Sequence, residues 1–337
     1  MSIQIKVINY LDKDEIFEIT ISEKDRMIDI RKEIQKRSVY FSDMSYNRIG
    51  LFIFVSKELL GESEPKKSKK VLRSENNRFD IKTKYPEKLK LSTKNDLNIF
   101  ESYPYIKNNY QNIKLYCYDL GLQINTPLAN TIEYSAPILI LILYIIKFFY
   151  FDKKTKLNKI QLWTIIMIIF HYSKRVFESI FVHIQINTME FKMFLLECLY
   201  YIIYFGLYAQ KKIFNIEKDF EDNSKMFYIV FFFISEINNY HCHIILRKIR
   251  LENPNKREIP KGNIFNYVFC ANYFWEICSW LFISLFSNIK SIYFFTLMGG
   301  IVMTLWALEK KEFYNKMLLK SNNKINNNKM AIIPFII

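Results

Sequence analysis

The sequence predicts a polytopic α-helical membrane protein, with about six or seven transmembrane helices, that follows an N-terminal α+β domain of the ubiquitin-like β-grasp type. Two observations predict this fold class. Half of the 337 residues are apolar and 17% are aromatic, and long apolar segments crowd the chain from Tyr134 onward. Before that position, short alternating patterns typical of strands flank one amphipathic helical pattern.

The predicted N-terminal domain covers residues 1–122. Apolar and polar residues alternate in Ser2–Asn9 and Ile16–Ser22, which predicts a half-buried hairpin. Met27–Arg37 has helical spacing, with Asp25 as a candidate N-cap, and 51–55 and 113–118 are two further strand candidates. This order is that of a ubiquitin-like β-grasp. Residues 61–112, rich in Lys, Glu, Asn and Ser, are expected to form a long, partly disordered polar insertion.

The predicted membrane domain covers residues 123–337. The charged first 30 residues contain no signal-peptide pattern, so insertion is expected to use an internal apolar segment. With six spans both termini lie on one side, and the loops on that side carry more Lys and Arg, which predicts that both termini are cytosolic. The six apolar segments are residues 134–151, 160–172, 193–209, 226–246, 264–286 and 290–308, of which the second is the shortest.

Composition and missing motifs exclude several functions. The net charge of +15 favours anionic lipid headgroups or phosphorylated ligands, and no nucleic-acid partner is expected beside so many apolar segments. The chain has no G-x-G-x-x-G, P-loop or G-x-S-x-G motif, and its four histidines are too few for a multi-histidine di-iron site. We expect no metal site at His241, Cys242 and His243, because helical positions i and i+2 point to different faces.

Polar residues recur within the apolar segments, where burying a charge costs at least ~2.5–3.5 kcal/mol. Such residues are expected to face a shared interior cavity suited to a large, phosphorylated, partly apolar ligand. Any single amide or carboxylate could instead be an interhelical hydrogen bond, Arg175 and Glu178 could form an interfacial ion pair, and the basic loop 247–263 could serve topology alone. The clusters are Asn239, His243, Arg247 and Arg250; Asn272, Tyr273, Glu276 and Trp280; and His171, Tyr172, Lys174, Arg175 and Glu178, with Glu133 opening the first segment.

In this order, several short strings resemble the steroid 5α-reductase superfamily, and within it the very-long-chain trans-2-enoyl-CoA reductases of fatty-acid elongation. The resemblance covers essentially the whole chain. The strings are "YCYDLGLQI" (116–124), "EYSAP" (133–137), "FHYSKRVFESIFVH" (170–183), "ILRKIR" (245–250), "REIPKGNIF" (257–265), "CANYFWEICSW" (270–280) and the terminal "IIPFII".

The resemblance implies an NADPH-dependent reductase of the endoplasmic reticulum membrane, acting on a long-chain trans-2-enoyl-CoA beside other elongase subunits. It maps the catalytic pair onto Tyr172 and Glu133. Guanidinium groups suit the cofactor phosphates, while amides and a carboxylate suit nicotinamide and ribose. The implied NADPH contacts are Asn239, His243, Arg250, Arg257, Asn272, Tyr273, Glu276 and Tyr314.

Two departures from the family pattern leave alternatives open. Lys311 stands where the family usually has histidine, and an Asn/Lys-rich stretch at 321–329 replaces the usual Tyr-Pro and Arg. The alternatives are a steroid or polyprenyl enone reductase of the same superfamily, or a non-catalytic scaffold of the elongase complex. The N-terminal domain is expected to be a docking module rather than a ubiquitin-like modifier, because the chain continues past its last strand.

Overall fold

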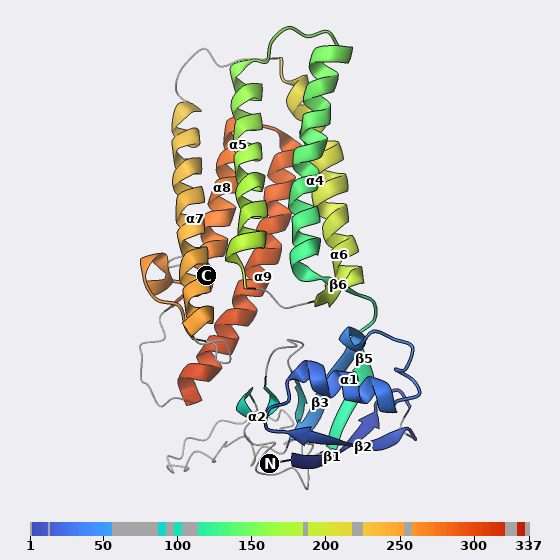
Figure 1. Ribbon diagram of the computed structural model, residues 1–337. Coiled ribbons are helices and arrows are strands. Elements are labelled where there is room, and N and C mark those ends of the chain that lie inside the picture. The colour runs from blue at the N-terminus through green and yellow to red at the C-terminus, as the bar shows by residue number, and fades with distance from the viewer. Residues whose placement is uncertain are drawn as a thin grey trace, which may run out of the picture. The chain divides into compact units, whose positions relative to one another are not determined.

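The computed structural model describes residues 2–12, 14–55, 87–91, 98–102, 114–184, 188–217, 225–252, 258–320 and 329–333 (Figure 1). The chain divides into two compact units. The first is Met1–Gln123 with Ile186–Glu190, and the second is Ile124–Gln185 with Phe191–Ile337. Each unit encloses an apolar core of its own.

The first unit is built on a five-stranded sheet in the order β2-β1-β5-β3-β4. β1 pairs antiparallel with β2 and parallel with β5, so the central strand comes last in the sequence of the unit. Alternate β1 residues Ile3, Ile5 and Val7 are buried, as the period of two predicts. The strands are β1 (Ser2–Asn9), β2 (Ile16–Ser22), β3 (Ile49–Val55), β4 (Glu87–Lys90) and β5 (Lys114–Asp119), with a short 3₁₀ helix η1 (Tyr46–Arg48) before β3.

Helix α1 (Met27–Arg37) covers this core with one apolar face. The N-cap is Arg26, whose backbone N–H donates to Asp29 Oδ2 at 2.9 Å. The expectation of an Asp25 cap is wrong. The Asp25 carboxylate instead accepts hydrogen bonds from the Ser22 backbone N–H and hydroxyl, 2.8 and 2.7 Å away, and so closes the turn before the helix.

Two described elements lie within the stretch predicted to be a polar insertion. β4 pairs antiparallel with β3, and α2 (Ile99–Ser102) follows. Leu91, Ile99 and Phe100 are buried in the core of the unit, and their apolar side chains explain why this part is ordered. The rest of the predicted insertion lies outside the described residues.

The second unit is a helical bundle (Figure 1), and every predicted apolar segment is helical over most of its length. The fifth segment starts later than expected, at Ala271 rather than residue 264. A 3₁₀ turn and backbone bonds from Phe269 and Cys270 to Met330 and Ala331 come first. The α-helices are α4 (Thr126–Ile146), α5 (Lys159–Phe177), α6 (Phe191–Cys198), α7 (Met226–Glu252), α8 (Ala271–Ser287) and α9 (Lys290–Lys320).

Shorter elements extend or join these helices. Three π-helical stretches continue α4, α5 and α6 without a break in the chain. They are η3 (Lys147–Phe151), η4 (Glu178–Val182) and η5 (Leu199–Ala209). Two 3₁₀ helices are η6 (Gln210–Asn215) and η8 (Asn263–Asn266). Two short strands are β6 (Gln123–Asn125) and β7 (Thr188–Glu190).

Four helical stretches of the described chain are long and apolar enough to cross a membrane: Thr126–Phe151, Phe191–Asn215, Met226–Glu252 and Lys290–Asn315. Large apolar side chains on them are exposed, which requires an apolar solvent. The chain is therefore a polytopic membrane protein. α5 and α8 are not among the four, so the total of six spans stays a prediction.

Trp280 of α8 is the ring on which the core of the bundle converges. Its ring centroid lies 5.0 Å from that of Phe205, 4.7 Å from Phe295 and 5.8 Å from Tyr172. These rings come from η5, α9 and α5, so one indole joins four helical elements. Aromatic pairs at such distances add to the burial of their area.

Glu15 connects the β1–β2 turn of the first unit to the end of α1. Its carboxylate accepts hydrogen bonds from Asn9 Nδ2 at 2.6 Å, Ser38 Oγ at 2.8 Å and the Val39 N–H at 2.5 Å. Burial alone raises the pKa of this carboxyl, but the hydrogen bonds outweigh it and hold the pKa below its ordinary value.

We expect Glu15→Gln to lower the stability of the first unit by about 1–3 kcal/mol near pH 7, because the amide has a single acceptor oxygen and cannot accept from Asn9 as well as from Ser38 and Val39. The contribution of Glu15 to the free energy of unfolding is complete above its unfolded-state pKa of ~4.3. It disappears as the pH falls through the lower pKa that Glu15 has in the folded state. Amide hydrogen exchange of β1 and α1 in the full chain measures it. Glu18→Gln, on the exposed side of β2, is the control, and equal effects of both changes would contradict the assignment.

Candidate active site

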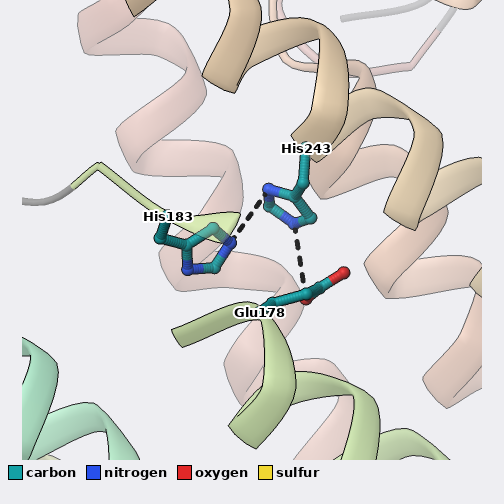
Figure 2. Close-up of side chains that lie close together, drawn as sticks. All are labelled: Glu178, His183 and His243. Carbon is teal, nitrogen blue, oxygen red and sulfur yellow. Dashed lines mark hydrogen bonds and ion pairs between the residues drawn. The ribbon is translucent and has the colours of Figure 1, made fainter. Parts of the chain in front are cut away.

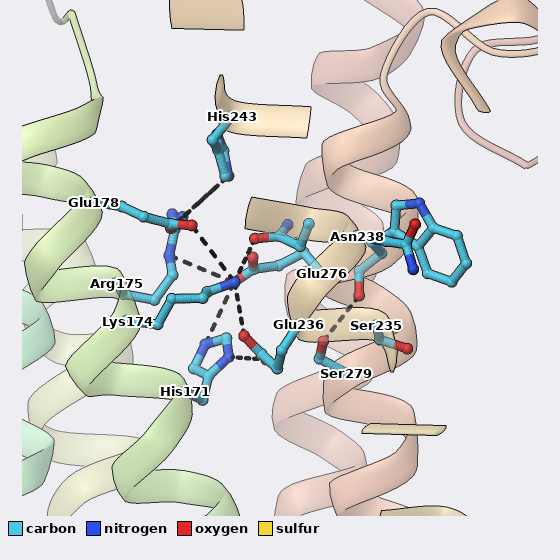
Figure 3. Close-up of polar contacts among 12 residues, drawn as sticks. His171, Lys174, Arg175, Glu178, Ser235, Glu236, Asn238, His243, Glu276 and Ser279 are labelled. Carbon is cyan, nitrogen blue, oxygen red and sulfur yellow. Dashed lines mark hydrogen bonds and ion pairs between the residues drawn. The ribbon is translucent and has the colours of Figure 1, made fainter. Parts of the chain in front are cut away.

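A buried cluster of charged and polar side chains joins α5, α7 and α8 in the second unit (Figure 3). α5 and the first residue of η4 contribute His171, Lys174, Arg175 and Glu178, whose spacing of three and four residues places them on one helical face. α7 contributes Glu236, Asn239 and His243 with similar spacing, and α8 contributes Asn272 and Glu276. The structure brings these nine side chains together, and eight of them, all except Glu236, belong to the clusters that were expected to face a shared interior cavity.

Glu236 is the centre of the cluster, and its side chain is fully buried. One carboxylate oxygen lies 2.7 Å from His171 Nδ1, and the other lies 2.7 Å from Lys174 Nζ. Lys174 Nζ also donates to Asn239 Oδ1 at 2.5 Å. The Asn239 amide completes this set by donating to the Asn272 carbonyl at 2.8 Å, which links α5, α7 and α8.

Arg175 forms the second half of the cluster. Its Nη1 donates to Glu178 Oε2 at 2.7 Å, its Nη2 donates to the Tyr134 hydroxyl at 3.1 Å, and its Nε lies 3.7 Å from Glu276 Oε1. The ion pair between Arg175 and Glu178, which the sequence analysis left open as an interfacial pair, is present, but it is buried and belongs to a larger network. The guanidinium also lies over the Tyr134 ring, 4.9 Å from its centroid.

His171 lies between two carboxylates of the cluster. Glu178, Glu236 and Glu276 supply three carboxylates, and Lys174 and Arg175 supply two cations. His171 has a carboxylate at each ring nitrogen, Glu236 at 2.7 Å and Glu276 at 3.4 Å.

Glu178, His183 and His243 could in principle hold a metal ion, since their ligand atoms lie within 4.8 Å of one another (Figure 2). Arg175 Nη1, however, lies 3.3 Å from His243 Nε2 and also bonds to Glu178. A guanidinium only donates, so His243 Nε2 accepts and His243 Nδ1 is left to donate to His183 Nε2, 3.2 Å away. The guanidinium thus occupies the place of a cation between His243 and Glu178.

Tyr172 and Glu133 form no hydrogen bond or ion pair with this network among the described residues, although the Tyr172 ring lies 5.3 Å from that of His171. Tyr172 packs among Phe205 and Trp280, and its hydroxyl is buried without a hydrogen-bond partner among the described residues. Glu133 on α4 is also buried, and its Oε1 has no partner there either, while its carboxyl group hydrogen-bonds with that of Glu197 on α6. No hydrogen bond joins the described side chains of Tyr172 and Glu133 directly.

Two of the remaining predicted cofactor contacts, Tyr273 and Tyr314, lie in a separate group. The Tyr273 hydroxyl accepts a hydrogen bond from Lys310 Nζ at 2.8 Å, and Tyr314 stacks on Phe269 with centroids 5.4 Å apart. Tyr273, Tyr314 and Phe269 belong to one small apolar cluster at the start of α8. Arg250 is exposed at the end of α7 and donates to the Ile184 carbonyl. Arg257 lies outside the described residues.

Three side chains of these groups were not singled out by sequence reasoning: Glu236, His183 and Lys310. Glu236 is the one acidic residue within the fourth apolar segment, and that position alone is a signal, since an isolated carboxylate at membrane depth requires a partner. His183 ends the string at 170–183. Lys310 carries no comparable signal, because it begins a charged run at the end of α9.

Comparisons with known proteins agree on one family. The profile of the 3-oxo-5-alpha-steroid 4-dehydrogenase family matches residues 182–337. The very-long-chain enoyl-CoA reductase of Dictyostelium discoideum is 30% identical over 66% of this chain and 74% of its own length. A Caenorhabditis elegans protein named probable very-long-chain enoyl-CoA reductase is 31% identical over 67% and 77%. The human trans-2,3-enoyl-CoA reductase-like protein is 26% identical over 67% and 64%.

We expect Glu236→Leu to destabilise the bundle by about 3–5 kcal/mol, because it leaves Lys174 and His171 buried without their carboxylate. Thermal unfolding of the detergent-solubilised full chain measures the change. Glu252→Gln removes a carboxylate from the same helix, but one that is 58% exposed, and should change the melting temperature little. A similar melting temperature for both variants would show that Glu236 is not the centre of a stabilising network.

Proposed function

Because the chain belongs to the very-long-chain enoyl-CoA reductases of the steroid 5α-reductase superfamily, we propose that it reduces the trans-2 double bond of a long-chain or very-long-chain enoyl-CoA. NADPH is the reductant, and the product is the saturated acyl-CoA of the last step of fatty-acid elongation. Family membership makes the protein an oxidoreductase acting on CH–CH bonds. The observation that carries the proposal is a pair of buried acidic groups with unpaired atoms, the Tyr172 hydroxyl and Glu133 Oε1.

An unpaired buried hydroxyl is costly. Leaving such a group without a partner costs about 1–3 kcal/mol, and a substrate carbonyl oxygen would remove that cost by accepting from Tyr172. The apolar rings of Phe205 and Trp280 around it suit an acyl chain and keep water out, which strengthens a hydrogen bond to developing negative charge. These features are what a thioester of a fatty acid requires.

The catalytic roles follow from this chemistry. A bound NADPH supplies the hydride for C3 of the enoyl group, and negative charge then collects on the thioester oxygen. Tyr172 donates a hydrogen bond or its proton to that oxygen, because a phenol with a free pKa of ~10 is a neutral donor at pH 7. C2 takes up one proton as the enolate becomes the saturated thioester. Glu133 would orient or polarise the phenol, since both groups are buried in low-dielectric surroundings. Its hydrogen bond with the Glu197 carboxyl means that the pair can hold one proton between them.

The described residues also suit the cofactor. A nicotinamide cofactor accompanies this family, and NADPH in particular needs cations for its phosphates. Lys310 is half-buried beside Tyr273 and forms no ion pair among the described side chains, so its charge is available to a phosphate. The Asn272 and Glu276 side chains, at the start of α8, suit ribose and nicotinamide. Asn239, His243, Arg250, Arg257 and Tyr314 complete the proposed set.

The buried network of α5, α7 and α8 has a supporting role in this proposal. Fixed charges of both signs hold the three helices in one register and need no rearrangement when a ligand binds, which is how active sites stabilise developing charge. Because Glu276 belongs both to this network and to the proposed cofactor set, the network would position the cofactor relative to Tyr172.

The location and organisation are part of the proposal. We place the protein in the endoplasmic reticulum membrane with six or seven spans and both termini in the cytosol. Residues 1–122 would be a ubiquitin-like β-grasp domain, supported by the mixed sheet with its parallel β1–β5 pair and the single covering helix α1. This domain would dock other elongase subunits, and residues 123–337 would hold the catalytic site.

We expect Tyr172→Phe to lower turnover of a long-chain trans-2-enoyl-CoA by on the order of 10²–10³ while NADPH still binds, because the change removes one donor to the oxyanion. The rate of NADPH oxidation by purified protein measures turnover, and equilibrium binding of NADPH to the same protein measures cofactor affinity. Tyr144→Phe is the control: its hydroxyl donates to the Leu207 carbonyl outside the candidate site, so activity should stay within about twofold, far below the loss of 10²–10³ expected for Tyr172→Phe.

Three outcomes decide between the proposed functions. Collapse of turnover in Tyr172→Phe alone supports enoyl-CoA reduction with Tyr172 as donor. NADPH binding without any action on the enoyl-CoA indicates an enone reductase of the same superfamily. An absence of NADPH binding by the wild-type chain indicates the elongase scaffold, for which the altered position Lys311 is the motivating observation.

We expect Lys310→Gln to raise the KM for NADPH about 10-fold or more, since a charged hydrogen bond to phosphate contributes ~1.5–3 kcal/mol. The KM for NADH should stay nearly unchanged, because NADH lacks the 2′-phosphate to which we assign Lys310. Lys311→Gln removes the same charge from the next residue and should leave both constants within about twofold, because among the described residues the Tyr273 hydroxyl bonds to Lys310 and not to Lys311. Equal losses for both lysines would assign the effect to long-range charge.

A further inference from the structure

A cavity lies at the ends of η3 and η6 and the start of α5. Its volume is about 690 Å³, within the usual range for sites of small organic ligands. Asn158 Nδ2 and Gln161 Nε2 of α5 both donate to the Ile216 carbonyl, at 2.8 and 3.2 Å. These bonds hold the loop before α5 against the chain that follows η6, so the wall of the cavity is a built structure.

The rim of this cavity is basic. Lys147, Lys154, Lys156 and Lys211 line it, with only Asp152 and Glu217 as acidic residues. None of these four lysines forms a salt bridge among the described residues, although both carboxylates belong to the same cavity. Several unpaired ammonium groups around one cavity suit an anion with several oxygens, and phosphate is the commonest such group.

The inner wall is apolar and aromatic. The rings of Phe148 and Phe214 lie 5.5 Å apart between centroids, and Tyr144 lies 5.9 Å from Phe214. Phe148 is 6% exposed, so the wall is part of the packed bundle. A cavity with a basic rim and an aromatic wall fits an amphipathic anion better than inorganic phosphate, which has no apolar part.

The position of the cavity matches a lipid headgroup. The membrane-spanning stretches Thr126–Phe151 and Phe191–Asn215 both end beside it, at the level where apolar helix gives way to charged loop. Gln161 lines the cavity, whereas Lys174 belongs to the charged network. The two residues are 13 positions apart on α5, which corresponds to about 20 Å along the helix. The cavity is therefore not part of the candidate active site.

The preference of Lys and Arg for cytosolic loops does not explain the lysines around this cavity. In the predicted orientation this end of the bundle faces away from the cytosol. Loops on that side of a membrane are normally depleted in Lys and Arg. Lysines at helix ends commonly reach toward the interface, but that tendency alone does not gather four unpaired ammonium groups around one cavity. We propose that the cavity binds an anionic phospholipid, with its phosphate at Lys147, Lys154, Lys156 and Lys211 and its acyl chain along Phe148 and Phe214.

The test uses the full-length protein in neutral detergent, with dioleoylphosphatidic acid as the probe. Native mass spectrometry and the shift in melting temperature measure binding, with dioleoylphosphatidylcholine, glycerol 3-phosphate and inorganic phosphate in parallel. The lining variant combines Lys147→Gln, Lys154→Gln and Lys211→Gln. The matched control combines Lys153→Gln, Lys159→Gln and Lys212→Gln, which removes the same charge from neighbouring positions that do not line the cavity.

The expected result is that phosphatidic acid binds wild type and control alike, at least ~10-fold more tightly than phosphatidylcholine, and that the lining variant loses ~10-fold or more of this affinity. Equal losses in both variants, or no preference for the anionic lipid, would overturn the proposal. A shift with inorganic phosphate as large as that with phosphatidic acid would replace the lipid by a free phosphate ion.

A further pair of measurements covers poor folding of the lining variant. Lys147→Arg, Lys154→Arg and Lys211→Arg together keep the charge and should keep the binding. The affinity of wild type for phosphatidic acid should fall as salt is raised, because exposed charge pairs are screened. Loss of binding in the arginine variant, or salt-independent binding, would also contradict the proposal. None of these readouts requires reductase activity.

Discussion

The cost of burying charge is the constraint on which the helical bundle depends. Three carboxylates and two permanent cations lie between α5, α7 and α8, and each is buried or nearly so. An isolated ion at this depth would be prohibitive, so the arrangement is stable only when every partner is in place. The helices can therefore not slide or rotate independently without separating Glu236 from Lys174 or Arg175 from Glu178. The site is positioned by this requirement more than by the surrounding apolar contacts, which are less directional.

The sequence predicted the secondary structure of both units well, because periodicity reports which face of an element is buried. The hairpin of β1 and β2, helix α1 and the apolar helices all follow such patterns. Predictions failed where the deciding bond was local: Asp25 closes a turn instead of capping α1, and the backbone bonds of 267–270 to 330–331 delay the start of α8. No periodic signal announces contacts of this kind.

The candidate site was predictable in composition but not in arrangement. Helical spacing correctly placed Asn239, His243 and Glu276 on faces that meet, since the polar atoms of a membrane helix turn away from lipid. It could not reveal that Glu236 is the shared partner, or that Tyr273 and Tyr314 belong with Lys310 in a separate group. Those facts depend on how three helices approach one another, which one sequence does not encode in any short pattern. The roles of Tyr172 and Glu133 rest on the family, and their unpaired polar atoms are consistent with them.

The backbone pairing of Phe269 and Cys270 with Met330 and Ala331 has a consequence for biogenesis. The two partners of this pairing are separated in the sequence by α8 and the whole of α9. During synthesis, α8 is therefore made and delivered to the membrane before the segment that anchors its first residues exists. The N-terminal end of α8, which carries Asn272, Tyr273 and Glu276, reaches its final geometry only after α9 has been inserted. A truncation or tag that prevents residues 329–333 from docking would leave an inserted, helical protein whose α8 end is never completed.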